Sequence, residues 1–282
     1  MSMNVYQLVT DRIIKQLENG VIPWHKPWGG VNGGAYNVVS NKPYSLLNQM
    51  ILQHKGAYAT FKQWQQLGGR IKRGAKAEII VFWKIIESTE VNTQGEKITK
   101  HIPYLKYYNV FHISSVEGVE INTDDTKHEP IKTISNADSL IDEYISREDI
   151  KFNEIATDKA FYSPSADMVQ VPCKEQYTNI NEYYSTVFHE LAHSTGHKTR
   201  LNRLTSGINS MFGSEEYSKE ELVAEISSAS IMSMLNIETN KTFTNSTSYI
   251  QSWLKVLKND NRFIVSASSK AEKAVNYILG VA

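Results

Sequence analysis

Apolar residues recur at helical spacing near the start of the chain and in several later segments. In Val5–Asn19 they line one face of a helix, which Gly20 and Pro23 end. A glycine- and tryptophan-rich loop, Pro23–Gly34, follows it. Further helices are expected over Ser45–His54, Phe61–Leu67, Ser139–Arg147, Ile180–Ser194, Ser218–Ser233, Ser248–Lys258 and Lys270–Leu279.

Runs of β-branched and aromatic residues predict strands. Ala77–Ile86 is rich in Ile, Val and aromatic residues, and Leu105–His112 is its expected partner after a polar turn near Asn92–Gly95. In the second half of the chain, Lys159–Tyr162 and Met168–Pro172 are strand-like. The segment Phe161–Pro172 can form a hairpin with a free edge for an extended peptide, although plain sheet structure explains it equally well.

A polar, acidic stretch with little periodicity, residues 115–136, divides the chain. We therefore predict an α+β protein of two domains, residues 1–115 and 137–282, joined by a linker over residues 116–136. A chain of 282 residues is long enough for two ordinary domains or one large one.

The composition is ordinary for a soluble globular protein, with 41% apolar and 21% charged residues. The single cysteine, Cys173, excludes a disulfide framework and fits a reducing compartment, so we expect a cytoplasmic protein. No apolar run reaches about 18 residues, and the start lacks the features of a signal peptide. We expect no membrane partner.

The net charge is zero, but the charges are unevenly distributed. Residues 1–114 carry 14 Lys and Arg against 6 Asp and Glu, a sum of +8, and the remaining 16 and 24 give −8. Such asymmetry suggests that the first half meets a polyanion.

Aromatic and basic residues are interleaved in the first half, as in proteins that bind single-stranded nucleic acid. Cations there follow the phosphates, and rings stack on bases. The alternative is that the rings fill a small core beneath a solvated basic face. Sequence-specific duplex reading and nucleotide hydrolysis are disfavoured, because no helix-turn-helix, zinc-finger or P-loop signature is present. The candidate DNA-binding residues are Trp24, Lys26, Trp28, Lys62, Trp64, Arg70, Lys72, Arg73 and Lys76.

His189 and His193 form an H-E-x-x-H sequence within the predicted helix Ile180–Ser194. A spacing of four residues puts both imidazoles on one helix face, where they can bind one Zn²⁺. Glu190 then lies beside the metal as the general base for a metal-bound water. An ordinary surface helix with two histidines is the alternative, which the helical context disfavours.

Zinc needs a third protein ligand, and the sequence offers more than one. A third histidine at the usual spacing is missing, since Thr199 occupies that position, and His197 follows the helix-breaking Gly196. The stronger candidate is Glu221, with Glu225 four residues later as a hydrogen-bond partner of the first histidine. Two alternatives remain: Glu225 can itself be the ligand, or Glu221 can complete a capping box with Ser218.

Both halves resemble the ArdC-type antirestriction proteins of mobile genetic elements such as plasmids and phages. The matching motifs cover nearly the full chain in the right order. They are residues 22–28 (IPWHKPW), 60–63 (TFKQ), 67–69 (LGG), 73–76 (RGAK), 81–84 (VFWK), 107–111 (YYNVF), 183–197 (YYSTVFHELAHSTGH), 220–225 (EELVAE) and 252–257 (SWLKVL).

The resemblance implies a small N-terminal domain that binds single-stranded DNA and a zincin-like metallopeptidase domain that follows it. It also implies His189, His193 and Glu221 as ligands of Zn²⁺, or of another divalent metal such as Mn²⁺, and Glu190 as base. The expected function is protection of incoming DNA from restriction enzymes, with a restriction or host defence protein as the candidate substrate of a hydrolase. The alternative is a protein that protects DNA only by binding it, with a structural or vestigial metal.

Overall fold

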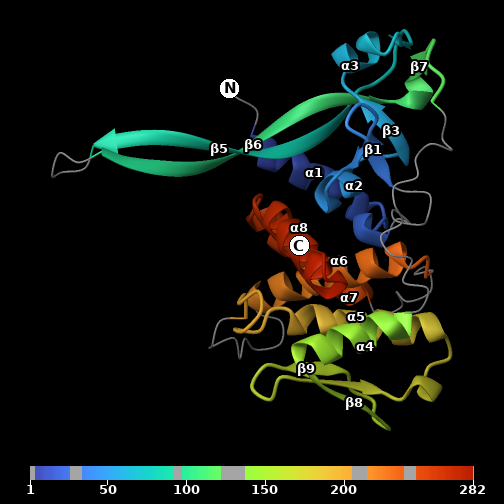
Figure 1. Cartoon of the computed structure of the whole chain (residues 1–282), viewed down its shortest axis with the longest axis vertical. Coiled ribbons are helices and arrows are strands. Elements are labelled where there is room, and N and C mark those ends of the chain that lie inside the picture. Colours follow the sequence, from blue (N-terminus) through green and yellow to red (C-terminus); the bar gives the residue numbers. More distant parts are fainter. Residues whose placement is uncertain are drawn as a thin grey trace.

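The computed structural model describes residues 4–25, 34–91, 97–121, 137–204, 215–237 and 246–281 (Figure 1). In the first half, a mixed five-stranded sheet has the order β2-β1-β3-β6-β5, with β1 and β3 parallel. The last two strands form a long antiparallel hairpin that projects from the rest of the molecule (Figure 1). The strands are β1 (Ala35–Asn37), β2 (Lys42–Pro43), β3 (Gly56–Ala59), β5 (Glu78–Val91) and β6 (Lys97–His112).

Short helices accompany this sheet. The side chain of Asn4 caps α1 by accepting a hydrogen bond from the backbone N–H of Tyr6, and Thr60 and Gln63 form a capping box at α3. These helices are α1 (Val5–Glu18), the 3-10 turn η1 (Pro23–His25), α2 (Leu46–Ile51), α3 (Phe61–Gln66) and the 3-10 turn η2 (Ile113–Ser115). A small two-stranded sheet joins β4 (Arg70–Ile71) to β7 (Val116–Glu117).

The second half is mainly helical. A three-stranded sheet of order β8-β10-β9 packs against α5, and β9 and β10 form the expected antiparallel hairpin. The strands are β8 (Lys151–Ile155), β9 (Phe161–Ser163) and β10 (Met168–Pro172), followed by the 3-10 turn η4 (Lys174–Gln176). The helices are α4 (Ala137–Glu148), α5 (Ile180–Ser194), α6 (Glu215–Met234), α7 (Ser246–Asn259) and α8 (Phe263–Leu279).

One hydrophobic core is shared by the two halves of the chain. It combines Val9 and Ile13 of α1 with Leu222 of α6 and Phe263 of α8, all buried. In Figure 1 the orange and red helices α6, α7 and α8 lie between the blue N-terminal helices and the layer of α4 and α5. A second core joins α4, α5, the ends of α6 and α8 and the three-stranded sheet. Helix α5, which carries His189 and His193, is thus packed into a buried core.

Most predicted elements are confirmed, and the mixed α+β class with them. The bounds of α5 and β10 match the predicted ones residue for residue. The predicted turn near Asn92–Gly95 lies outside the described residues. Of the predicted linker, Val116–Glu117 pairs with β4 and so belongs to the folded N-terminal half, while residues 122–136 lie outside the described part. The division into two domains remains a prediction.

No helix within the described ranges is both long enough and apolar enough to span a bilayer.

Candidate metal centre

Helix α5 carries the H-E-x-x-H residues, and its sequence separates an apolar face from a polar one. Val187, Phe188 and Leu191 are fully buried in the second core. Asn179 caps the helix by accepting from the backbone N–H of Asn181. The helix ends as predicted before Gly196, whose N–H donates to the carbonyl of His193 at 2.8 Å.

His189, His193 and Glu221 converge on one point. The two imidazole Nε2 atoms are 3.1 Å apart. The Glu221 carboxylate oxygens lie 3.4 Å from Nε2 of His189 and 3.3 Å from Nε2 of His193. Helices α5 and α6, which pack side by side, supply all three groups.

This donor set fits a divalent metal ion. A tetrahedral zinc with ligand bonds of about 2.0–2.1 Å separates its ligand atoms by about 3.3 Å, as simple geometry requires. The 3.1 Å between the two Nε2 atoms is close to that spacing, and each Nε2 has a Glu221 oxygen at a similar distance, Oε2 for His189 and Oε1 for His193. Two imidazoles and one carboxylate are also a usual protein donor set for catalytic zinc, which leaves a fourth position open.

The capping-box alternative for Glu221 is wrong. Helix α6 begins at Glu215, so Ser218 lies inside the helix and its hydroxyl is 2.7 Å from that of Ser252. The Glu221 carboxylate is 7% exposed and faces the two histidines instead. The ligand alternative for Glu225 is also disfavoured, because Glu225 lies near the other ring nitrogen, 3.7 Å from Nδ1 of His189.

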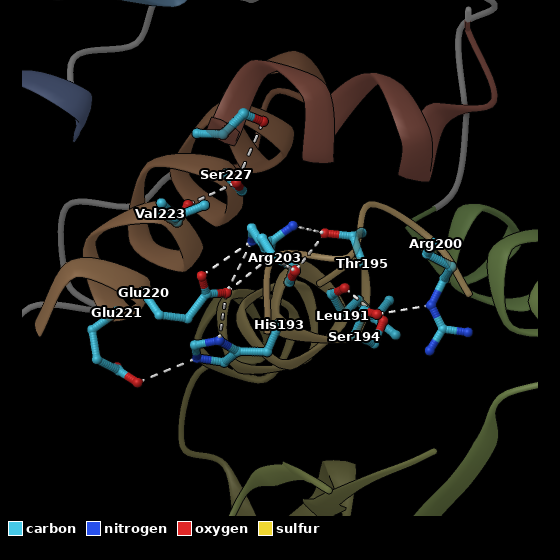
Figure 2. A network of polar contacts seen from close by, with 12 residues as sticks. Leu191, His193, Ser194, Thr195, Arg200, Arg203, Glu220, Glu221, Val223 and Ser227 are labelled. Carbon is cyan, nitrogen blue, oxygen red and sulfur yellow. Dashed lines mark hydrogen bonds and ion pairs between the residues drawn. The ribbon is translucent and has the colours of Figure 1, made fainter. Parts of the chain in front are cut away.

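Each histidine has a carboxylate on its Nδ1 side. Glu225 approaches His189, as the sequence predicts, and Glu220 lies 3.4 Å from Nδ1 of His193 (Figure 2). Such partners orient the imidazole and increase its basicity as a ligand. Glu220 is not among the site residues predicted from the sequence. The signal that could have found it is that Nδ1 of His193 needs a partner and that Glu220 adjoins Glu221.

Arg203 fixes Glu220 in turn. Its Nε is 3.1 Å from each carboxylate oxygen, and its Nη2 is 3.0 Å from Oε1 (Figure 2). The guanidinium also donates to the Thr195 hydroxyl at 2.6 Å and to the Ala192 carbonyl at the end of α5. A Cβ at Gly196 would lie 3.1 Å from Cγ of Arg203, so the glycine allows this close approach. Arg203 therefore ties α5 to α6.

The charges of the cluster shift its pKa values in opposite directions. Burial lowers the pKa of His193, but its hydrogen bonds to Glu220 and Glu221 outweigh burial and raise that pKa well above the ordinary value. Burial raises the pKa of Glu221, but the two histidines outweigh it and hold that pKa far below the usual range. Burial raises the pKa of Glu225. Both shifts favour a charged His193 beside an ionised Glu221.

Glu190 is 8% exposed on the same helix, and its charge acts on His193 and on Tyr177. His197 lies outside the ligand cluster: its Nδ1 is 2.8 Å from the Thr199 hydroxyl. This placement agrees with the prediction that Gly196 removes His197 from the helix.

The edge strand β9 runs beside α5. Arg200 fastens this hairpin to the end of α5, because its Nε donates to the Ser194 carbonyl at 2.8 Å while its terminal nitrogens bind Asp167 and the Tyr162 hydroxyl. Arg200 and Arg203 thus both form ion pairs within the structure, with Asp167 and Glu220 respectively.

The candidate DNA-binding residues separate into three groups. The prediction is wrong for two tryptophans. Trp24 is 2% exposed and packs against Trp253 in the shared core. Trp64 is fully buried, and its indole N–H donates to the Phe111 carbonyl. A ring with no free face offers no stacking surface for a base. Lys26 and Trp28 lie outside the described residues. The remaining candidates, Lys62, Arg70, Lys72, Arg73 and Lys76, are all exposed.

Two family models match the chain. The N-terminal domain of anti-restriction factor ArdC matches residues 3–111, and a zincin-like metallopeptidase matches residues 139–270. Two crystal structures of the antirestriction ArdC protein from plasmid R388 are similar, each with a TM-score of 0.74 over 98% of this chain and 97% of theirs. The metal-free one is 31% identical and the Mn(II)-bound one 29%.

Curated relatives include a DNA primase TraC of Escherichia coli, 31% identical over 97% of this chain. The match spans only 27% of that primase and 20% of a second TraC primase, so this chain covers about a quarter of their length or less. An uncharacterized protein of Sinorhizobium fredii is 29% identical, with 98% of this chain and 91% of that protein matched.

Proposed function

This chain belongs to the ArdC family of antirestriction proteins, and from that premise we propose that it protects incoming DNA from restriction with two coupled activities. Its first half binds single-stranded DNA. Its second half holds a divalent metal, Zn²⁺ or alternatively Mn²⁺, and hydrolyses a peptide bond in a restriction or host defence protein. The DNA partner and the single cysteine fit a cytoplasmic location.

The observation that carries the proposal is the convergence of His189, His193 and Glu221 with Glu190 on the same helix. A divalent metal held there supplies Lewis acidity and makes water a nucleophile near neutral pH. Glu190 takes a proton from the attacking water and returns it to the leaving amine nitrogen. Glu220 holds the imidazole of His193 in the orientation that ligation needs, and the nearby Glu225 carboxylate supports His189 more weakly.

The edge strand β9 supports a peptide substrate. Its outer side has no neighbouring strand among the described residues, and it lies beside the metal-motif helix. An extended peptide can add to such an edge through main-chain hydrogen bonds. We propose that the substrate binds in this way.

The exposed basic residues of the segment from α3 to β5 support DNA binding. Lys62, Arg70, Lys72 and Arg73 are exposed, and residues 34–77 contain no Asp or Glu. If these side chains contact phosphates, the affinity for DNA falls steeply as the salt concentration rises. Binding that is insensitive to salt would contradict this part of the proposal.

A second candidate function is protection by DNA binding alone, with a metal that only stabilises the fold. The shared core favours it, because α6 carries Glu221 and also places Leu222 in the core that α1 and α2 share. A metal that joins α5 to α6 would then stabilise both halves. The two functions differ at Glu190, which a purely structural site does not need.

The test is transfer of unmethylated plasmid DNA into a restricting host with and without this protein. We expect more transferred plasmids to survive when the protein is supplied and no effect in a host that lacks the restriction enzyme. Equal survival with and without the protein in the restricting host would refute the proposal. Metal content measured on the same purified protein establishes whether the site is loaded.

A further inference from the structure

The β5–β6 hairpin has two different faces near its base. Val81 of β5 and Leu105 of β6 lie on one face of the hairpin and are buried in the shared core against α1 and α2. Their cross-strand partners are Tyr107 and Trp83, respectively. Successive residues of a strand point to opposite faces. Phe82, paired with Lys106, therefore points away from that core, on what we call the outer face of the hairpin.

The outer face carries three exposed aromatic rings. Phe82 is 47% exposed, Tyr104 is 50% and Tyr108 is 41%. On β6, Lys106 lies between the two tyrosines at two-residue steps of about 6.6 Å, with its ammonium 5.1 Å from the centre of the Tyr108 ring. Phe82 meets Tyr108 edge to face at 6.1 Å between ring centres. Closer to the hairpin base, Ile80 lies on the same face in a buried cluster with Tyr44. The Tyr44 ring in turn lies 6.5 Å from the Phe82 ring, measured between ring centres.

The surroundings of the outer face favour a polyanion. Glu78 is the one acidic residue between positions 19 and 86, and its carboxylate already accepts hydrogen bonds from the Tyr58 hydroxyl and the Gln53 N–H. No acidic residue occurs between positions 97 and 112. A row of rings and a lysine in such a region has the chemistry that stacks bases and neutralises phosphates.

We propose that the outer face, formed by Phe82, Tyr104, Lys106 and Tyr108, is the base-stacking platform for single-stranded DNA. This inference rests on the proposed DNA-binding function and gives it a location. It also replaces Trp24 and Trp64, whose buried rings offer bases no surface. Bases stack on the rings, and Lys106 contacts the phosphate backbone.

The experiment measures fluorescence anisotropy of a labelled single-stranded oligothymidylate with the full-length protein at low salt. The test variants are Phe82→Ala and Tyr108→Ala, and Tyr108→Phe is the conservative variant that keeps the ring. The matched control is Trp83→Ala. Trp83 is the next residue on β5 and equally exposed, at 48%, but it points to the opposite face, where it meets Tyr6.

We expect each alanine on the outer face to weaken binding about 5- to 150-fold, because stacking contributes that much per base. Tyr108→Phe and Trp83→Ala should bind like the parent protein, and thermal unfolding midpoints of all variants should stay close to it. Unchanged affinity of Phe82→Ala and Tyr108→Ala, or an equal loss in Trp83→Ala, overturns the platform while DNA binding stands. Failure of the parent protein to bind the oligonucleotide overturns the proposed DNA-binding function itself.

Discussion

Glu220 should control how tightly His193 binds metal, although Glu220 is not a ligand. The change Glu220→Gln keeps the size of the side chain and leaves an oxygen that can still accept from Nδ1 of His193. It removes the negative charge that both His193 and Arg203 use. The imidazole then becomes a weaker ligand and loses the firm orientation that Arg203 imposes through Glu220.

The structure allows the size of the effect to be estimated. Loss of a carboxylate that orients a metal-binding histidine lowers metal affinity about 10- to 100-fold, or roughly 1.4 to 2.8 kcal/mol. Glu220 lies 3.4 Å from its histidine and is held by Arg203 through three contacts of 3.0 to 3.1 Å, so we expect a value near the upper end.

Glu225→Gln is the matched comparison. Its carboxylate is 3.7 Å from Nδ1 of His189, beyond a good hydrogen bond, and burial raises its pKa, so neutralising it changes less. We expect about a 10-fold loss or less. Zinc affinity is measured by competition with a chromophoric chelator. Circular dichroism of the metal-free variants separates a local effect from unfolding, which matters because Glu220→Gln leaves Arg203 without its ion pair.

Zinc binding by folded Glu220→Gln with the affinity of the parent protein would refute this role of Glu220. A larger loss in Glu225→Gln than in Glu220→Gln would also refute it, because the order of the two effects follows from the two distances and from Arg203.

Three further predictions concern acidity, packing and the shared core. Zinc affinity should rise with pH and level off above the raised pKa of His193, because a protonated ring cannot bind metal. Histidine titrates roughly between pH 5 and 8, so a zinc affinity that stays constant over this range would contradict the prediction. Gly196→Ala should lower the free energy of unfolding in urea by about 1–3 kcal/mol and weaken zinc binding, because the new Cβ would lie 2.7 Å from Cγ of Leu204. Unchanged stability would mean that the turn relaxes to accommodate the methyl group. Trp24→Ala should lower the free energy of unfolding by about 3–5 kcal/mol, and tryptophan fluorescence and far-ultraviolet circular dichroism should report one common transition. Separate transitions would mean that the shared core does not couple the two halves.

Local sequence signals predicted the metal-motif helix well. The bounds of α5 follow from a regular apolar stripe and a glycine just past its end, and the spacing of His189 and His193 predicts two ligands on one face. The start of α6 was predicted less well, because the helix packs against α5, α7 and α8 and its buried residues do not form one stripe. That error placed Ser218 at the start of the helix, where Glu221 would complete a capping box with it.

Other features depend on contacts that are distant in sequence. Strand β8 was missed because most of its residues are exposed, so it lacks the alternation of a half-buried strand. The role of Trp24 could not be read from nearby lysines, because its partner Trp253 lies far along the chain. For the same reason, the opposite charges of the two halves gave no sign that they share a hydrophobic core.

We propose that the metal site acts through Glu190 rather than only stabilising the fold. The decisive variant is Glu190→Gln, with metal content and survival of transferred unmethylated plasmid DNA measured on the same protein. We predict that the variant retains its metal, because the three ligands are intact, and loses protection of the DNA. Full protection by a metal-loaded Glu190→Gln protein would contradict the claim and favour protection by DNA binding alone.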